Sequence, residues 1–146
     1  MSELKISDLS VGDWVMYGGR PKKVGVIDLY KNNADDARVG FLVHKQSDGW
    51  HRVHYHNIED FTPIPITPEI LKKNGEYNSD YEIWSIGNRA VVSPERRKYR
   101  VHIYDCHINH TELVVFAEYV HQLQHALRWA GIDKEIELQQ NKTVKL

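Results

Sequence analysis

The stretch of sequence that decides the fold occupies residues 119–131 and reads YVHQLQHALRWAG. Its apolar residues recur three or four positions apart, which is the spacing of one face of an α-helix. They are Val120, Leu123, Leu127 and Ala130. Gly131 directly follows this stripe and is a typical helix stop. The pattern predicts an amphipathic helix over about 119–130 that packs its apolar face on the preceding segments.

Those preceding segments have the composition of β-strands separated by short turns. We predict strands over 81–86, 89–93, 99–105 and 112–116. In the third strand, Val101 and Ile103 fall on one face, and Arg100, His102 and Tyr104 fall on the other. A last edge strand is predicted over 134–138. Residues 76–138 are therefore expected to form an antiparallel sheet packed by one C-terminal helix, with 139–146 as a flexible tail.

A proline-rich connector separates this region from the first half of the chain. Residues 62–68 read TPIPITP, and three prolines in seven residues favour extended, stiff chain. Thr67 is the expected N-cap of a short helix, Pro68 its first residue and Gly75 its stop. The connector and its helix span 62–75.

The first half reads as a series of short strands. We predict strands over 14–17, 23–29, 39–44 and 50–56, with a short closing segment over 57–61. The opening, VGDWV, combines a tight turn with a first strand. Five short strands within about 50 residues resemble an SH3-like small β-barrel over 1–61. The predicted fold class is therefore α+β.

The composition narrows the classes of function. The chain has 146 residues, 41% hydrophobic and 27% charged, and a net charge of −1, all ordinary for a globular domain. The balanced charge argues against a strong nonspecific nucleic-acid binder. No apolar run is long enough for a membrane span, and the single cysteine permits no intrachain disulfide. A cytoplasmic location is expected.

Two stretches, TPIPITPEIL at 62–71 and YVHQLQHALRWAGI at 119–132, resemble uncharacterised proteins of phages and mobile elements of Bacteroidales-type bacteria. Those proteins also tend to open on a strand of the VGDWV type. The resemblance implies a small accessory gene of a phage or prophage. Such genes often encode DNA-handling adaptors, structural accessories or inhibitors of host defence. The resemblance assigns no site residues and no cofactor.

The helix presents the first candidate site, because His121, His125 and Arg128 lie on one of its faces. The two histidines have the spacing of a zinc protease motif, but Gln122 stands where that motif has its glutamate base. Zinc proteolysis is therefore disfavoured. Histidines that pack against neighbouring strands are the ordinary structural interpretation.

Two further candidate sites lie on predicted strands. Trp50, Arg52 and His54 alternate onto one strand face, where they could stack a base or hold a phosphate. A solvated edge strand or a subunit interface is about equally compatible with that face. In the second half, the basic run over 95–100 continues onto the strand face of Arg100 and His102, so it favours an anion site that also includes Arg97.

A cluster of metal-ligand residue types spans the second half of the predicted strand over 99–105 and the turn that follows it. Its members are His102, Asp105, Cys106, His107 and His110. A closed metal site usually needs four converging ligands, whereas a strand that ends in a polar turn needs none. No nucleophile elbow, phosphate loop or dinucleotide fingerprint is present in the sequence.

The hypothesis that follows is a non-enzymatic, phage-encoded protein that binds a small anionic nucleotide and sequesters a host immune signal. The alternative is a small-barrel adaptor for DNA or for a phage or host protein. A basic stripe of Lys22, Lys23, Lys45 and Arg52 would favour that adaptor. The third hypothesis is a metal-dependent hydrolase or phosphodiesterase. The many Trp and Tyr residues are compatible with a homo-oligomer.

Overall fold

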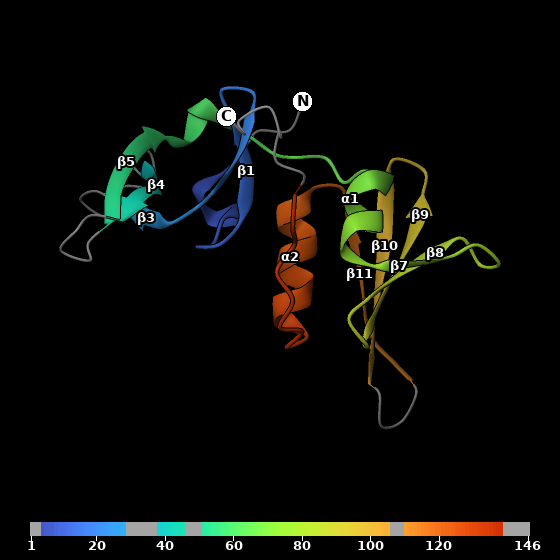
Figure 1. Ribbon diagram of the computed structural model, residues 1–146. Coiled ribbons are helices and arrows are strands. Elements are labelled where there is room, and N and C mark those ends of the chain that lie inside the picture. The colour runs from blue at the N-terminus through green and yellow to red at the C-terminus, as the bar shows by residue number, and fades with distance from the viewer. Residues whose placement is uncertain (1–3, 29–37, 46–50, 106–109, 139–146) are drawn as a thin grey trace. The chain divides into compact units, whose positions relative to one another are not determined.

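The computed structural model divides the chain into two compact units, Met1–Ile64 (unit 1) and Pro65–Leu146 (unit 2). It describes residues 4–28, 38–45, 51–105 and 110–138, with the backbone alone at 42–45, 51–53, 105 and 110–112. Both units combine antiparallel sheets with short helices, so the chain is an α+β protein (Figure 1). The boundary between the units falls within the proline-rich connector.

Unit 1 is built from two three-stranded antiparallel sheets. The first has the order β2-β1-β6 and the second the order β3-β4-β5. The strands are β1 (Trp14–Tyr17), β2 (Arg20–Lys23), β3 (Val26–Asp28), β4 (Arg38–Lys45), β5 (His51–Asn57) and β6 (Phe61–Thr62). Two short 3-10 helices, η1 (Ile6–Asp8) and η4 (Ile58–Asp60), complete it. Within the described residues these strands form no closed barrel.

Two of the predicted strand boundaries in unit 1 are wrong. The expected strand over 23–29 is divided between the end of β2 and β3. β2 begins before Pro21, which an edge strand tolerates. The expected closing strand over 57–61 is the 3-10 helix η4 followed by the two-residue β6.

Both sheets of unit 1 supply side chains to its core. Its buried apolar residues are Leu4, Leu9, Val15, Val24, Val39, Phe41 and Phe61. The VGDWV opening forms a turn in which Gly12 has φ 96°, a left-handed conformation that glycine adopts without strain. The Oδ2 atom of the buried Asp13 accepts the backbone N–H of Ser10 at 2.8 Å, which fixes the turn before β1.

Unit 2 begins with the short helix that the connector predicts. Helix α1 (Pro68–Asn74) starts with Thr67 as N-cap, and the Thr67 hydroxyl accepts the backbone N–H of Ile70. Gly75 ends the helix in an extended conformation. A Cβ at Gly75 would lie 2.6 Å from the carbonyl oxygen of Ser85, so the absence of a side chain lets two backbone segments pass closely.

A five-stranded antiparallel meander, with the order β11-β10-β9-β8-β7, forms the centre of unit 2. Its strands are β7 (Glu76–Asn78), β8 (Ile83–Ile86), β9 (Ala90–Glu95), β10 (Lys98–Asp105) and β11 (His110–Ala117). β7 was not predicted, because three exposed residues carry no hydrophobic alternation. The predicted alternation of β10 is confirmed, since Val101 and Ile103 are fully buried.

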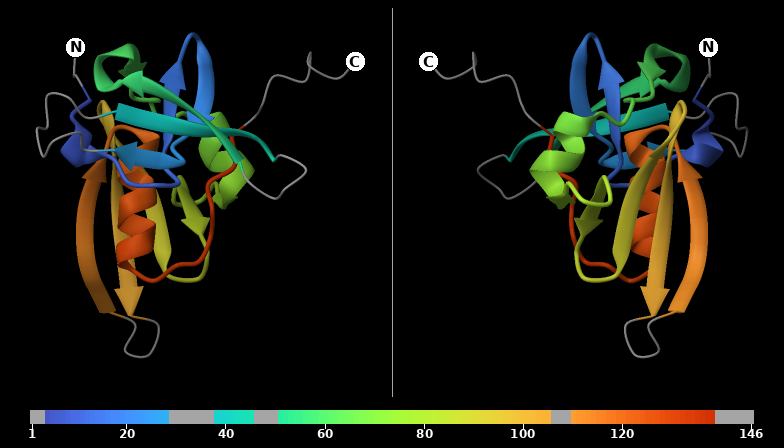
Figure 2. Two further views of the ribbon diagram at one scale, coloured as in Figure 1. Left: turned by 90° about the vertical axis from the view of Figure 1, so that its left-hand side faces the viewer. Right: turned by 90° about the vertical axis from the view of Figure 1, so that its right-hand side faces the viewer.

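Helix α2 (Val120–Trp129) covers one face of this sheet, and the two views of Figure 2 show the strands from opposite sides. All four residues of its predicted apolar stripe are buried. The helix ends in a Schellman motif: Ile132 N–H bonds to Leu127 O and Gly131 N–H bonds to Arg128 O. Gly131 has φ 73°, as this motif requires.

The segment after α2 was predicted as an edge strand over 134–138, and that prediction is wrong. The segment is irregular, yet Ile136 and Leu138 are buried. The buried side chain of Asn74 fixes it instead of a neighbouring strand. Asn74 Nδ2 donates to Glu137 O at 2.8 Å, and Asn74 Oδ1 accepts from Glu137 N at 2.6 Å.

Among the described residues, neither helix has the length and apolar character that a membrane-crossing helix needs.

Candidate functional site

The sheet of unit 2 has an outer face, which is turned away from α2. The strand register places alternate residues of β8 to β11 on it. The outer-face residues considered below are Ser85, Val91, Ser93, Arg100, His102, Tyr104, Val114 and Phe116. Val114 and Phe116 are each 44% exposed, which is unusual for large apolar side chains on a sheet. This face therefore presents apolar, aromatic and cationic groups together.

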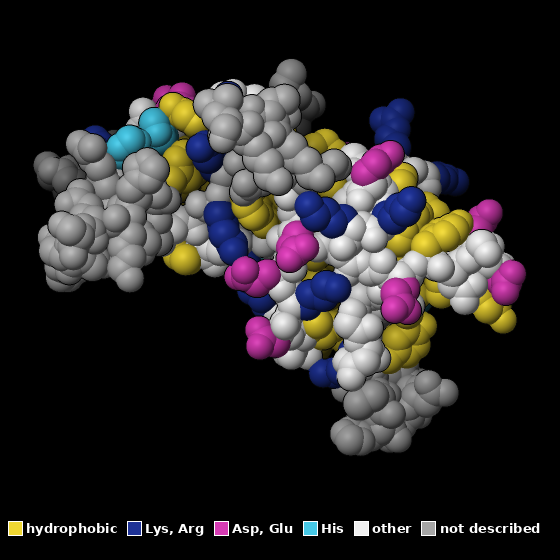
Figure 3. All heavy atoms as spheres, viewed as in Figure 1, with side chains coloured by type: hydrophobic (Ala, Val, Ile, Leu, Met, Phe, Trp, Pro, Cys, Tyr) yellow, Lys and Arg dark blue, Asp and Glu magenta, His cyan; other side chains and the backbone are white. Residues whose placement is uncertain are grey.

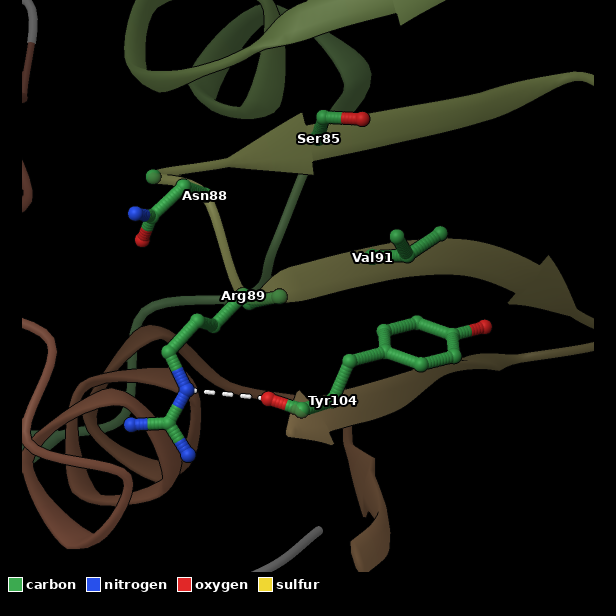
Figure 4. Close-up of a pocket in the computed structure, with 7 residues that line it drawn as sticks. Ser85, Asn88, Arg89, Val91 and Tyr104 are labelled. Atoms are coloured by element: carbon green, nitrogen blue, oxygen red, sulfur yellow. Dashed lines mark hydrogen bonds between the residues drawn. The ribbon is translucent and has the colours of Figure 1, made fainter. Parts of the chain in front are cut away.

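One end of the outer face is hollowed into a pocket of about 430 Å³. Figure 4 shows Ser85, Val91 and Tyr104 projecting from three adjacent strands into this region. The turn residues Gly87 and Asn88 form its rim. The volume lies in the range of small-molecule sites, and the lining combines one aromatic ring with a hydroxyl and an amide.

Arg89 also borders the pocket but has a structural role. Its Nε donates to Tyr104 O at 2.9 Å, and its Nη1 donates to Ala130 O at 2.7 Å. The second bond caps the last turn of α2, where backbone carbonyls lack helical partners. Arg89 thereby ties the helix to the sheet at the end where Tyr104 lines the pocket.

The aromatic part of the outer face continues from Tyr104 to His102. Their rings lie nearly parallel, with centroids 6.1 Å apart and an interplanar angle of 16°. His102 Nδ1 is buried and makes no hydrogen bond to any residue that the structure describes. A buried polar atom without a partner costs free energy. The outer face therefore has a hydrogen-bonding requirement that its described neighbours leave unmet.

The other end of the outer face is cationic. Lys98 Nζ lies 4.5 Å from the ring centroid of Phe116, and Arg100 Cζ lies 5.6 Å from it. Arg100 Nη2 also lies 2.6 Å from Glu95 Oε2 in an ion pair. Both Arg100 Nε and Glu95 Oε2 are buried without a well-aligned hydrogen bond. The ion pair is thus a one-point contact, not the bidentate pairing that a guanidinium can form.

Arg97, the third cation predicted for this site, lies in the tight turn between β9 and β10 and is exposed. Its neighbour Arg96 has φ 57°, a left-handed conformation that costs a residue with a side chain about 1–2 kcal/mol. The turn adds two exposed cations to the end of the sheet where Arg100 lies. Elsewhere on the surface shown in Figure 3, cationic and anionic side chains are interspersed.

The helical candidate residues lie across the sheet from this site. His121 is buried and stacks on Tyr119, with ring centroids 6.0 Å apart, and its ring meets that of His125 edge-on at 5.9 Å. Arg128 is exposed and lines a smaller cavity of about 140 Å³ together with Gln124. Because α2 lies on the opposite face of the sheet, these residues cannot share a pocket with His102.

The candidates from the first half are described only in part. Trp50 lies outside the described residues, and Arg52 is described by its backbone alone. His54 is exposed on β5, where it is paired with Phe41 of β4. His56 shares the strand parity of His54 and packs inward: its Nδ1 lies 3.0 Å from Tyr17 Oη. That part of the face belongs to the core of unit 1.

The basic stripe that would favour a DNA adaptor is described only at Lys22 and Lys23. Lys22 and Lys23 are consecutive on β2, so they lie on opposite faces of that strand. Lys23 Nζ lies 5.7 Å from the ring centroid of Trp14. Lys45 and Arg52 belong to strands of the other sheet, and their side chains lie outside the description.

The predicted metal cluster falls largely outside the described residues. Residues 106–109 are not described, and at Asp105 and His110 only the backbone is. Within the described part of the chain, no group of three metal-ligating side chains comes together.

Sequence reasoning omitted several residues of this site. Tyr104 could have been included, because it shares the strand parity of Arg100 and His102. Ser85 and Asn88 could not, because their proximity to Tyr104 depends on the register of three strands. Comparison with known proteins gives no match: no family model, no curated protein and no solved structure is similar to the chain.

Proposed function

We propose that this protein binds a small anionic nucleotide without altering it, and that the ligand lies on the outer face of the unit 2 sheet. The observation that carries the proposal is that aromatic side chains and a cationic side chain follow one another along the same face of β10. The pocket and the Tyr104–His102 pair can accommodate a base, and Arg100 can hold a phosphate.

The phage-type resemblance adds a biological context to this proposal. A protein that binds a signalling nucleotide tightly and releases it slowly lowers its free concentration, so a host defence effector would not be triggered. Sequestration requires affinity but no catalytic group. The proposal accordingly gives the site residues binding roles only.

The proposal is tested by titrating the full chain with nucleotides in a calorimeter. We expect saturable binding that Tyr104→Leu weakens through the base and Arg100→Gln weakens through the phosphate. Removing one stacking contact costs about 1–3 kcal/mol, which is roughly a 5- to 150-fold loss of affinity. Lys72→Gln is the matched control, because Lys72 is exposed on α1 and outside the site. Equal binding by all three variants would overturn the assignment.

A second candidate function concerns unit 1, whose two small sheets around one core support an SH3-like interpretation. Such domains often act as adaptors. The observation that favours this role is the exposed aromatic ring of Tyr55 on β5, which is 43% exposed. The test is the fluorescence anisotropy of a labelled DNA duplex with the full chain. Binding that Tyr55→Ser weakens would support the adaptor, and an unchanged anisotropy would count against its DNA-binding form.

A further inference from the structure

The two recognition groups of the outer face lie far apart along one strand. Tyr104 and Arg100 are four residues apart on β10, and Lys98 is two residues beyond. At about 3.3 Å per strand residue, these separations are roughly 13 Å and 20 Å. His102 lies between them on the same face, beside Val91 of the neighbouring strand. A ligand that reaches both groups must be elongated.

The guanidinium of Arg100 is held by a poor internal partner. Glu95 meets it through Nη2 alone, while Nε remains buried without a hydrogen bond. A phosphate can accept from both nitrogens at once, which is the strongest geometry available to arginine. The Arg100 side chain is 40% exposed, so an anion from solvent can reach it. The Glu95 carboxylate therefore occupies a position that suits a phosphate better.

The charges around this position also favour a multiply charged ligand. Arg96, Arg97, Lys98 and Arg100 belong to the same hairpin as the single carboxylate of Glu95, an excess of three positive charges. Attraction between charges scales with their product and weakens with salt. A chain of phosphates gains more from this cluster than one phosphodiester does.

We infer that the ligand is a linear nucleotide with two or three phosphates, which lies along β10 and displaces Glu95 from Arg100. This inference rests on the proposed nucleotide-binding function. The base occupies the pocket beside Tyr104, and the polyphosphate crosses His102 toward Arg100 and Lys98. A nucleoside monophosphate is too short to span both groups. A cyclic dinucleotide carries its phosphates within a ring between two bases, so it extends no anionic chain toward the hairpin.

The test is a calorimetric series on the full chain with adenosine, AMP, ADP, ATP and cyclic di-AMP, without magnesium. We expect affinity to rise about tenfold with each phosphate beyond the first, and ATP to bind more tightly than cyclic di-AMP. Glu95→Gln is expected to tighten ATP binding about tenfold and to leave adenosine binding unchanged. Glu59→Gln, a change at an exposed glutamate of η4 in unit 1, is the control.

The outcomes separate this inference from the function on which it rests. If neither the native chain nor the Glu95→Gln variant binds any of the five compounds, the proposed nucleotide-binding function is wrong. If AMP or cyclic di-AMP binds as tightly as ATP, the function stands and the inference is overturned. If ATP is preferred but Glu95→Gln leaves the affinity for ATP unchanged, only the proposed displacement of Glu95 from Arg100 is refuted.

Discussion

The substitution Asn74→Ala provides the sharpest test of how unit 2 is held together. Asn74 is buried at the end of α1 and makes three side-chain hydrogen bonds. Its Nδ2 donates to Ile70 O at 2.7 Å and to Glu137 O at 2.8 Å, and its Oδ1 accepts from Glu137 N at 2.6 Å. The two bonds to Glu137 replace the strand partner that the irregular C-terminal segment lacks.

The cost of this substitution follows from the number of bonds lost. Three bonds at about 1 kcal/mol each give about 3 kcal/mol, and alanine returns roughly 0.5 kcal/mol through its higher helix propensity. Detachment of Ile136 and Leu138 would add about 3–6 kcal/mol of lost burial, but the released backbone regains about 1–2 kcal/mol per residue. The lost burial and the regained backbone entropy largely cancel. We therefore expect a loss of about 2–3 kcal/mol.

Two measurements on the full chain check this value. The thermal midpoint of unit 2 should fall by roughly 10–20 °C, given about 4–8 °C per kcal/mol for a unit of this size. Hydrogen exchange at the Glu137 amide should accelerate before the sheet itself opens. The matched control is Asn78→Ala, which removes the bonds that Asn78 Oδ1 accepts from Asp80 N and Tyr81 N in an exposed turn. We expect a loss below about 1 kcal/mol there.

The reasoning is refuted if Glu137 exchanges at the same rate in Asn74→Ala as in the native chain. That result would mean that burial of Ile136 and Leu138 alone retains the segment. An equal loss of stability in the Asn78 control would likewise show that burial of the hydrogen bond is not what matters.

Three further predictions concern other parts of unit 2. Gly75→Ala should destabilise the unit by about 1–3 kcal/mol in urea unfolding, because its Cβ would lie 2.6 Å from Ser85 O. Arg96→Gly should stabilise the unit by about 1 kcal/mol, by relieving the left-handed backbone, and should weaken ATP binding; calorimetry checks both. Burial and, secondarily, Glu69 raise the pKa of Tyr99 above 10.0. Its contribution to stability should be present below pH 10 and lost as pH rises through the raised pKa. Difference titration against Tyr99→Phe checks this, and Glu69→Gln should lower the pKa only in part.

The sequence predicted those elements whose signals are local. Thr67 and Gly75 delimit α1 because capping and chain reversal are decided by a few adjacent residues. The apolar stripe of α2 and the alternation of β10 were equally readable, because each element buries one face. The three-residue β7 was not, because its pairing with β8 supplies all of its structure.

The site was predictable to the extent that it lies on one strand. Arg100 and His102 were identified from their shared parity on β10. The contacts of Arg100 with Phe116 and Glu95 depend on the registers of β11 and β9, which no local pattern encodes. The helical group failed to join them for a related reason. Periodicity assigns His121 to a helix face but does not say which face of the sheet that helix covers.

The outer face of unit 2 carries several energetic costs that a merely solvated sheet could avoid. Arg96 adopts a backbone conformation that glycine would adopt without strain. Arg100 and His102 each have a buried nitrogen without a hydrogen bond, which a smaller polar residue would not have. Phe116 leaves 44% of its surface exposed, where a polar residue would be neutral or favourable. Each cost alone is unremarkable in size, at about 1–3 kcal/mol for a buried unpaired group. Their coincidence on one face of the sheet and in the hairpin turn beside it is the pattern expected where stability has been exchanged for binding, and a ligand that pairs with Arg100 would recover part of it.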